Sequence, residues 1–204
     1  QASAAKSLAQ KTRRERLMRQ GVSWHDLEEA KAKNVTLMPE LSALAKRVLE
    51  EDFSKGWGAY LSGVAGGGKT SQLSLLAEWL DARGERVILT SEDRMLCEIR
   101  QNNHDAAQFE RAPWLLLDEA GGAKGSEYET GKLELVIDWR VKHRLPTIFA
   151  SNASIEEIAG QGVWNGRLYS RLFKILATPA NIHDGFVTDH RIAAFMSILT
   201  EGGQ

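Results

Sequence analysis

The chain has 204 residues, of which 43% are hydrophobic and 26% charged, a balance typical of a globular protein with a core of its own. Its net charge of −1 excludes a uniformly basic nucleic-acid binder but not a locally basic surface. The single cysteine, Cys97, and the five histidines have no ligand-like spacing, so we expect no internal disulfide, no structural zinc and a reducing, cytoplasmic location.

The first 22 residues are polar and basic. No apolar stretch follows their charges, so they do not form a secretory signal, and no apolar run in the chain reaches the length of a membrane span. Two interpretations stay open: a solvated helix start or arm, or a surface that contacts phosphates or docks onto a partner. Whether a further docking domain precedes Gln1 also stays open. Six basic residues stand here against Glu15, for a net charge of +5: Lys6, Lys11, Arg13, Arg14, Arg16 and Arg19.

Helical periodicity runs from residue 23 to 51, after which short apolar runs alternate with amphipathic stretches. We expect strands at 58–62, 86–90, 114–118, 147–151 and 174–178. We expect helices at 70–82, 93–100, 127–143 and 165–173. This alternation predicts an α/β fold, in which helices cover both faces of a parallel sheet. The expected division is a basic helical arm or linker at 1–52 and an α/β domain at 53–204, whose motifs indicate its function.

Residues 63–70, Gly-Val-Ala-Gly-Gly-Gly-Lys-Thr, match the phosphate-loop pattern G-x-x-x-x-G-K-[ST] between an expected strand and an expected helix. The glycines let backbone N–H groups wrap around phosphates, and the helix N-terminus adds a favourable dipole. We expect Lys69 to contact the β- and γ-phosphates and Thr70 to ligate Mg²⁺. The residues predicted to bind ATP are Gly63, Val64, Ala65, Gly66, Gly67, Gly68, Lys69, Thr70 and Ser71.

The run Trp-Leu-Leu-Leu-Asp-Glu at 114–119 is an apolar strand that ends in two carboxylates. In a parallel α/β sheet this end of the strand faces the ligand. We expect Asp118 to hold Mg²⁺ through its water shell and Glu119 to orient and deprotonate the attacking water. The pair predicts ATP hydrolysis rather than binding alone. A nucleotide kinase would need a mobile lid, and no arginine-rich insertion indicates one.

Three polar residues in the last third of the chain extend the predicted site. Asn152 follows an expected strand and lies either between the γ-phosphate and the attacking water or in a helix cap or turn. Arg167 and Arg171 are four residues apart and so share one helix face. Either both are solvated, or one acts as an arginine finger on the γ-phosphate bound by a neighbouring subunit.

Seven further motifs accompany the phosphate loop: Leu-Leu-Leu-Asp-Glu-Ala-Gly (115–121), Ser-Glu-Tyr-Glu (126–129), Asp-Trp-Arg (138–140), Leu-Pro-Thr (145–147), Ser-Asn (151–152), Arg-x-x-x-Arg-Leu (167–172) and Asp-His-Arg (189–191). In this order they resemble the motifs of DnaC/DnaI-type replicative helicase loaders. IstB-type transposition helper ATPases share much of the pattern. The resemblance covers roughly residues 14 to 195. It implies an AAA+ P-loop NTPase with a five-stranded central sheet and a minimal helical lid.

The resemblance also implies roles for individual residues. Asn152 falls on the sensor-1 position, and Arg171 falls on the arginine finger, with Arg167 as a second candidate. Arg191 falls on a sensor-2 arginine that contacts nucleotide within the same subunit.

The stretch 91–111 occupies the place of an extra helix that helps to form a spiral assembly and lines a path for single-stranded DNA. Phe109 and Tyr128 are candidate base-stacking residues there, because every base offers a π-face. Ordinary core or groove packing is the alternative for both rings.

We therefore expect an ATPase of DNA replication that binds ATP, Mg²⁺ and single-stranded DNA and has no membrane partner. It self-associates into a ring or spiral and loads or remodels a replicative hexameric helicase. The alternative is a transposition helper that binds duplex DNA and recruits a transposase. Loaders usually carry a longer helicase-binding region than the roughly 55 residues before this ATPase core, which leaves the helicase partner open.

Overall fold

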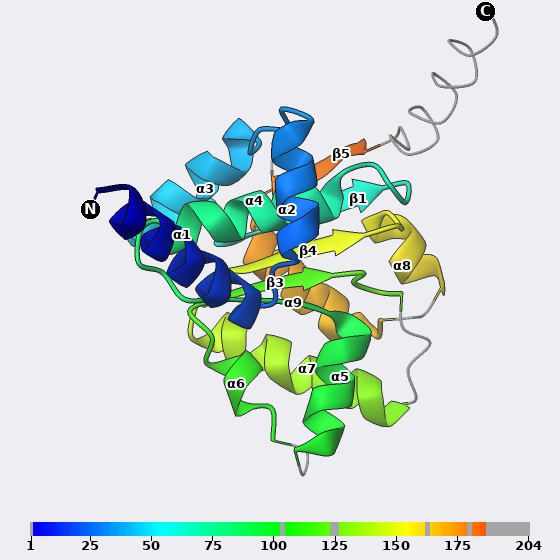
Figure 1. Cartoon of the computed structure of the whole chain (residues 1–204). Coiled ribbons are helices and arrows are strands. Elements are labelled where there is room, and N and C mark those ends of the chain that lie inside the picture. The colour runs from blue at the N-terminus through cyan, green and yellow to red at the C-terminus, as the bar shows by residue number, and fades with distance from the viewer. Residues whose placement is uncertain (1, 103–104, 123–126, 162–163, 179–180, 187–204) are drawn as a thin grey trace, which may run out of the picture.

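The structure, a computed structural model, describes residues 2–102, 105–122, 127–161, 164–178 and 181–186. Its centre is one sheet of parallel strands in the order β2-β3-β4-β1-β5 (Figure 1). The predicted parallel five-stranded sheet is therefore confirmed. The strands are β1 (Gly58–Gly63), β2 (Val87–Ser91), β3 (Trp114–Asp118), β4 (Thr147–Ser151) and β5 (Ile182–Phe186).

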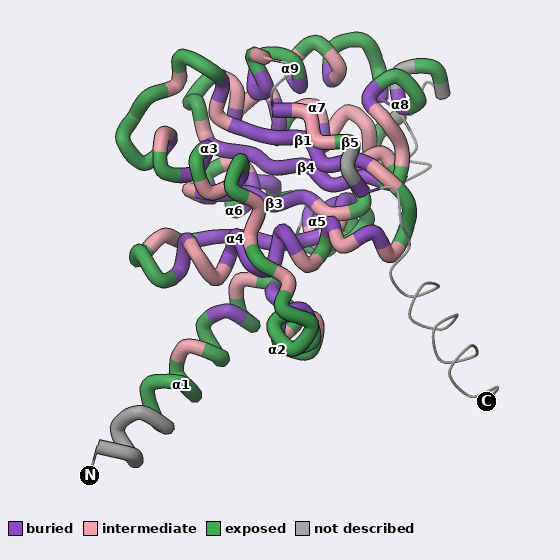
Figure 2. The backbone as a smooth tube through the Cα atoms, turned by 90° about the horizontal axis from the view of Figure 1, so that it is seen from above, coloured by how far each residue is buried: buried purple, intermediate pink, exposed green. Residues whose placement is uncertain are grey.

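Alternate residues of each strand enter two hydrophobic clusters, one on each face of the sheet. On β3, Trp114 and Leu116 belong to the first cluster, whereas Leu115 and Leu117 belong to the second. Both faces are covered by helices, so the strands are buried in Figure 2, as parallel strands require. The first cluster takes residues from α1 (Ala2–Arg19), α2 (Trp24–Ala32), α3 (Pro39–Leu49) and α4 (Lys69–Asp81). The second takes residues from α5 (Glu92–Gln101), α6 (Ala107–Glu110), α7 (Glu127–Lys142), α8 (Ile155–Gln161) and α9 (Gly166–Leu176).

The strands predicted at 58–62, 86–90, 114–118 and 147–151 are confirmed to within one residue at each end. The strand predicted at 174–178 is wrong, because these residues continue α9 through Leu176, and β5 follows later in the chain. Asn165 caps this helix, since its Oδ1 accepts the N–H groups of Arg167 and Leu168 at 3.1 and 2.9 Å. Apolar residues at helical spacing then continue to the last turn, and Ala177, in the left-handed region with φ 57°, ends the helix.

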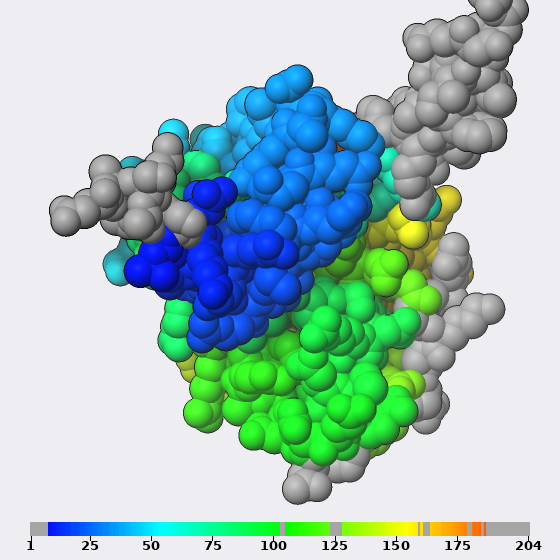
Figure 3. Space-filling view, viewed as in Figure 1, coloured from blue at the N-terminus to red at the C-terminus, as the bar shows by residue number. Residues whose placement is uncertain are grey.

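The basic N-terminal segment packs onto the rest of the molecule, and it forms the blue surface in Figure 3. Leu17 of α1 is fully buried in the first cluster. Arg16 donates from Nε and Nη2 to the two oxygens of the buried Asp81 on α4, at 2.5 and 2.7 Å. Arg13 lies 3.2 Å from Glu78 of the same helix. Part of the basic charge of this segment therefore attaches α1 to α4.

The division of the chain at residues 52 and 53 stays a prediction. In the described part of the chain, none of the helices has the length and apolar character needed to cross a membrane.

Candidate active site

The phosphate loop connects β1 to α4 and needs glycine at several positions, two of which show the reasons. Gly68, which precedes α4, has φ 101°, a conformation that other residues rarely adopt. At Gly67 a Cβ atom would lie 2.9 Å from the carbonyl oxygen of Phe186 at the end of β5. The glycine run therefore serves both the turn into the helix and the close approach of the loop to β5.

Lys69 lies inside this loop rather than in solvent. Its side chain is largely buried, and Nζ donates to the carbonyl oxygens of Gly63 and Val64 at 2.7 and 2.8 Å. Val64 in turn donates its backbone N–H to the carbonyl oxygen of Phe186 at 2.7 Å. The ammonium group thus lies where the phosphate-loop pattern expects the β- and γ-phosphates.

The two residues expected to hold Mg²⁺ are in direct contact. Thr70 donates from Oγ1 to Oδ2 of Asp118 at 2.7 Å, which joins the start of α4 to the end of β3. The backbone N–H of Glu119 donates to Oδ1 of Asp118 at 2.9 Å. Hydroxyl and carboxylate oxygens are the ligand types that Mg²⁺ prefers, so this pair fits the ion.

A cavity of about 780 Å³ opens above the phosphate loop at the carboxyl end of the sheet. This volume is within the range of small-molecule sites. Gly66–Gln72 and Asp118, Glu119 and Asn152 line one side of it. The opposite wall, which the sequence did not predict, comes from α2 and the residues after it: Asp26, Glu29, Ala30, Lys33 and Val35.

Gln72 of α4 fixes the position of this opposite wall. Its Oε1 accepts the N–H of Met38 at 2.8 Å, and its Nε2 donates to the carbonyl oxygen of Thr36 at 2.9 Å. Gln72 is buried, whereas a glutamine in an amphipathic helix is ordinarily exposed. A polar residue among the apolar positions of this helix is the one sequence signal for the wall.

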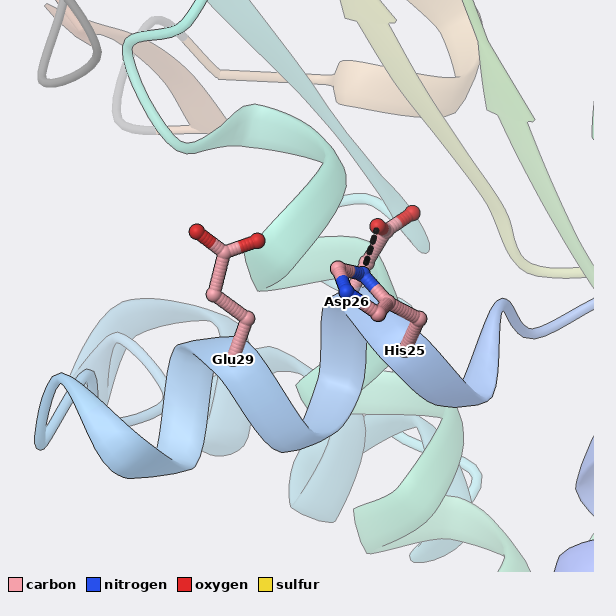
Figure 4. Close-up of side chains that lie close together, drawn as sticks. All are labelled: His25, Asp26 and Glu29. Carbon is pink, nitrogen blue, oxygen red and sulfur yellow. Dashed lines mark hydrogen bonds and ion pairs between the residues drawn. The ribbon is translucent and has the colours of Figure 1, made fainter.

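Three side chains of α2 lie close together, as Figure 4 shows for His25, Asp26 and Glu29, and the last two line the cavity. One potential ligand atom from each lies within 4.8 Å of the others. His25 Nδ1 and Asp26 Oδ1 are 3.5 Å apart. His25 and Glu29 are exposed, and Asp26 is half-buried. Because the spacing of their ligand atoms is the sole feature that suggests a metal ion, we assign no metal to this cluster.

The turn after β3 carries Glu119 in the left-handed region, with φ 53°, which is uncommon for a residue other than glycine. Each backbone N–H of residues 119–122 has an acceptor. One acceptor comes from a distant side chain: Glu92 of α5 takes the N–H of Gly121 on Oε2 at 2.7 Å. Burial raises the pKa of Glu92 to about 7. Glu92, which the sequence analysis missed, thus helps to fix the turn that presents Glu119.

Asn152 lies at the predicted place, exposed and lining the cavity. Of its two alternatives, the helix cap is formed by another residue, whereas the turn agrees with the bend in which Asn152 lies. Ser154 accepts the N–H of Glu157 on Oγ at 3.2 Å, and Glu157 accepts the N–H of Ser154 on Oε2 at 2.7 Å. This reciprocal pair is a capping box at the start of α8. The sensor role of Asn152 stays a prediction.

Both candidate arginine fingers project from α9, and neither lines the cavity of its own subunit. Arg171 donates from Nε to Oδ1 of Asp138 on α7 at 2.6 Å, and its side chain is 26% exposed. The side chain of Arg167 is 80% exposed, with Nη1 3.8 Å from Glu134. Hydrogen bonds from Lys142 and then Arg171 lower the pKa of Asp138. Only Arg167 therefore reaches outward as the subunit stands.

The two candidate stacking residues differ in exposure. Phe109 is 1% exposed in the second hydrophobic cluster, so it offers no face to a base, and the core-packing alternative is correct for it. Tyr128 at the start of α7 is 49% exposed, with Nζ of Lys132 5.5 Å from its ring centre. Arg191 lies outside the described residues, as does the predicted lid.

Comparisons with known proteins support this fold through structure alone. No family model matches the sequence, and no curated protein matches it either. A DnaI crystal structure aligns with a TM-score of 0.56 and 23% identity, over 70% of this chain and 86% of that one. The DnaC helicase loader aligns with a TM-score of 0.53 and 16% identity, over 65% of this chain and 82% of that one.

DnaA, a replication initiator, is a further structural neighbour. Its complex with AMPPCP and single-stranded DNA aligns with a TM-score of 0.54 and 20% identity, over 69% of this chain and 45% of that one. This chain also covers less than half, 46%, of AMPPCP-bound DnaA from Aquifex aeolicus. The parallel sheet, its strand order and these alignments together show that the chain has the AAA+ P-loop NTPase fold of DnaC/DnaI-type helicase loaders and of DnaA.

Proposed function

We propose that this chain is a Mg²⁺-dependent ATPase of DNA replication that binds single-stranded DNA and loads or remodels a replicative hexameric helicase. The observation that carries the proposal is the contact between Thr70 and Asp118, with Lys69 and Glu119 beside it, at one cavity. Phosphate-loop residues alone would suit any nucleotide-binding protein. A carboxylate held next to the loop, followed by a second one at the mouth of the cavity, suits hydrolysis.

Each residue of the cavity has a part in this proposal. Thr70 and Asp118 hold Mg²⁺, which when bound neutralises charge on the β- and γ-phosphate oxygens. Lys69 and the loop N–H groups bind those phosphates. Glu119 accepts a proton from the attacking water, and Asn152 orients that water. Arg191 lies outside the described residues. The resemblance alone assigns it the role of an arginine that contacts the nucleotide.

Self-association completes the site. A phosphate loop leaves the outer side of the γ-phosphate uncovered, and the arginines of α9 lie away from the cavity of their own subunit. An arginine from a neighbour would supply the missing charge and make hydrolysis depend on assembly. A single subunit is then a slow ATPase.

The assignment to replication rests on the kinds of protein that share the fold. One neighbour is described as a helicase loader, and another is an initiator solved with a nucleotide analogue and single-stranded DNA. The sequence identities to these structures are 16 to 23%, so the likeness supports the fold, and the activity and partners are our proposal.

The test uses Glu119→Gln, in which ATP binding is expected to persist without turnover. With ATP, this variant is expected to retain single-stranded DNA and a purified hexameric helicase from the host, whereas Lys69→Ala retains neither. Preference for duplex DNA together with retention of a transposase would instead support the transposition-helper function. ATP consumption that requires a small-molecule acceptor and ignores DNA would contradict both.

A further inference from the structure

A second cavity, of about 500 Å³, lies at the opposite end of the sheet from the nucleotide site. It is a groove formed by the end of α1, the first residues of β2 and the connection from α6 to β3. Figure 3 shows the blue N-terminal part of the molecule directly against its green part. Four arginines line the groove above an apolar floor that includes Val87 and Ile88: Arg16, Arg19, Arg86 and Arg111.

Three of these arginines have no ion-pair partner within the described part of the chain. Arg16 is bound to Asp81, so it contributes little. Among the described residues no carboxylate oxygen lies within 4.0 Å of a guanidinium nitrogen of Arg19, Arg86 or Arg111. Nor does any carboxylate line the groove itself. In a chain of net charge −1, this is a local concentration of positive potential facing one concave surface.

The residue types in the groove indicate which anion it suits. A guanidinium group presents a planar fork of donors that fits a phosphate bidentately. The three arginines come from separate parts of the chain, the last turn of α1, the residue before β2 and the connection from α6 to β3, so the groove offers several phosphate-binding forks. A chain of phosphates suits this arrangement better than one small anion does. The described lining contains no aromatic ring, so base stacking would not contribute and binding would depend on the backbone alone.

We propose that this groove binds the sugar–phosphate backbone of DNA through Arg19, Arg86 and Arg111. The proposal rests on the function proposed above, which supplies DNA as the polyanion, and it assigns the DNA contact to arginines instead of to the buried Phe109. Binding of this kind is independent of base sequence and strongly dependent on salt. An acidic protein segment is the competing occupant that the experiment has to separate.

The test compares two triple variants with equal loss of charge. One is Arg19→Gln with Arg86→Gln and Arg111→Gln. The control changes three exposed lysines with no ion pair in the described part of the chain: Lys46→Gln, Lys55→Gln and Lys174→Gln. Fluorescence anisotropy follows binding of single-stranded and duplex DNA of about 20 nucleotides, and of a glutamate-rich peptide, at several salt concentrations. Thermal unfolding checks that each variant is folded.

We expect the groove variant to bind DNA at least about tenfold more weakly at about 100 mM salt, while the control stays within about twofold of wild type. For single strands the slope of log K against log salt should become shallower by about 2, because about 0.7 counterions are released per phosphate contact. If the triple variant does not fold, the single substitutions carry the test, with an expected loss of about two- to fivefold each.

Four results would overturn the proposal. Equal weakening in both triple variants would mean that net charge, and not the groove, governs binding. Weakening of peptide binding alone would assign the groove to an acidic protein. Unchanged DNA binding by the groove variant would refute the groove while leaving the proposed function intact. If wild-type protein bound neither single-stranded nor duplex DNA, the groove proposal and the proposed function would both be wrong.

Discussion

Two buried ionisable side chains, Glu92 and Arg140, organise the ends of the central strands, and neither faces the nucleotide cavity. Glu92 accepts the N–H of Gly121 in the turn that presents Glu119. Arg140 has no exposed surface, and its hydrogen-bond acceptors among the described residues are all neutral oxygens between the end of α6 and β3 or at the start of β4. Each ties together segments far apart in sequence, so each makes the fold sensitive to one substitution.

The first prediction concerns Glu92. Burial raises the pKa of this residue from 4.5 to about 7. The folded state holds the proton more tightly than the unfolded chain, so this contribution to stability is present below pH 4.5 and is lost as the pH rises through 7. Glu92→Gln has no carboxyl group to ionise at this position, so it does not lose stability in this way as the pH rises. Relative to wild type, its free energy of unfolding should increase by up to about 3 kcal/mol between acidic and mildly alkaline pH. Urea titrations of both proteins at both pH values measure this. An unchanged difference would show that Glu92 titrates normally.

The second prediction concerns Arg140. Burial lowers the pKa of this residue to about 9. Its guanidinium donates to Pro146 O at 2.6 Å, Phe109 O at 2.8 Å, Ala112 O at 2.9 Å and Thr147 Oγ1 at 2.8 Å. Arg140→Met keeps the volume but leaves these acceptors unpaired, so the free energy of unfolding should fall by about 3 kcal/mol or more. The matched control is Arg144→Met at an exposed position. A loss below about 1 kcal/mol would show that water replaces the guanidinium.

The sequence predicted the local residues of the site and missed the distant ones. The phosphate loop, Asp118 and Glu119 form continuous motifs with a fixed place between a strand and a helix, and the structure brings their side chains together at one cavity. Glu92 and Gln72 act through contacts with residues about 30 positions away, which no local pattern encodes. Phe109 shows the reverse error, because an aromatic residue in the right segment gives no information on its burial.

At the scale of elements, α1 is the one whose attachment depends most on charge. Its last turns meet α4 through Leu17 and through Arg16 and Arg13, which contact Asp81 and Glu78. Arg16 is half-exposed, so water screens part of the ion pair, while Asp81 is buried. The same helix supplies Arg19 to the arginine groove. Loosening α1 would therefore also disturb the groove.

The third prediction is that Asp81→Ala releases the end of α1 from α4. After a discount for the exposure of Arg16, we expect a loss of about 1–2 kcal/mol in the free energy of unfolding. Hydrogen exchange of the α1 amides should accelerate, while exchange in β3 and β4 should remain as in wild type. Glu29→Ala, which removes an exposed partner of Lys33, is the control and should leave α1 unchanged. Equal exchange rates in α1 of Asp81→Ala and wild type would show that Leu17 and the pair of Arg13 with Glu78 suffice to attach it.

Elements with strong periodicity were predicted well, and the others were not. The helices predicted at 70–82, 93–100 and 127–143 match α4, α5 and α7 to within one residue at each end. The error at 174–178 arose because the short apolar run at the end of α9 fits both a helix turn and a strand. The short helices α6 and α8 were not expected, and helices of 4 and 7 residues give little periodicity to detect.

At the scale of the whole molecule, the proposed function requires contact between subunits. The nucleotide cavity opens on one side of the sheet, and neither arginine of α9 lines it. Arg171 is paired with Asp138 within the subunit, so its use as a finger would require an exchange of that partner, whereas Arg167 is already extended. Assemblies that mix two different variants can distinguish which of the two arginines acts as the finger.

The fourth prediction is that turnover depends on assembly. ATP hydrolysis per subunit should rise with protein concentration and with single-stranded DNA. Arg171→Ala should bind ATP normally yet hydrolyse it about 10³-fold or more slowly, as expected when a finger is lost. Mixing it with Lys69→Ala should restore part of the activity, because an intact site can form between two different defective subunits. The same mixture made with Arg167→Ala compares the second candidate.

An inactive mixture of folded, assembled Arg171→Ala and Lys69→Ala subunits would exclude Arg171 as a finger supplied by a neighbour. Activity that is restored only with Arg167→Ala in its place would transfer the role to Arg167. Turnover that is independent of protein concentration would contradict a shared site altogether.

The central claim is that Glu119 is the general base of an ATPase whose nucleotide is bound by the phosphate loop and Asp118. Its most direct test is steady-state ATP turnover by Glu119→Gln and wild type, with nucleotide affinity measured on the same samples. The account predicts equal affinity and a loss in turnover of about 10²–10⁴-fold, the usual contribution of a general base. Undiminished hydrolysis by Glu119→Gln would contradict it.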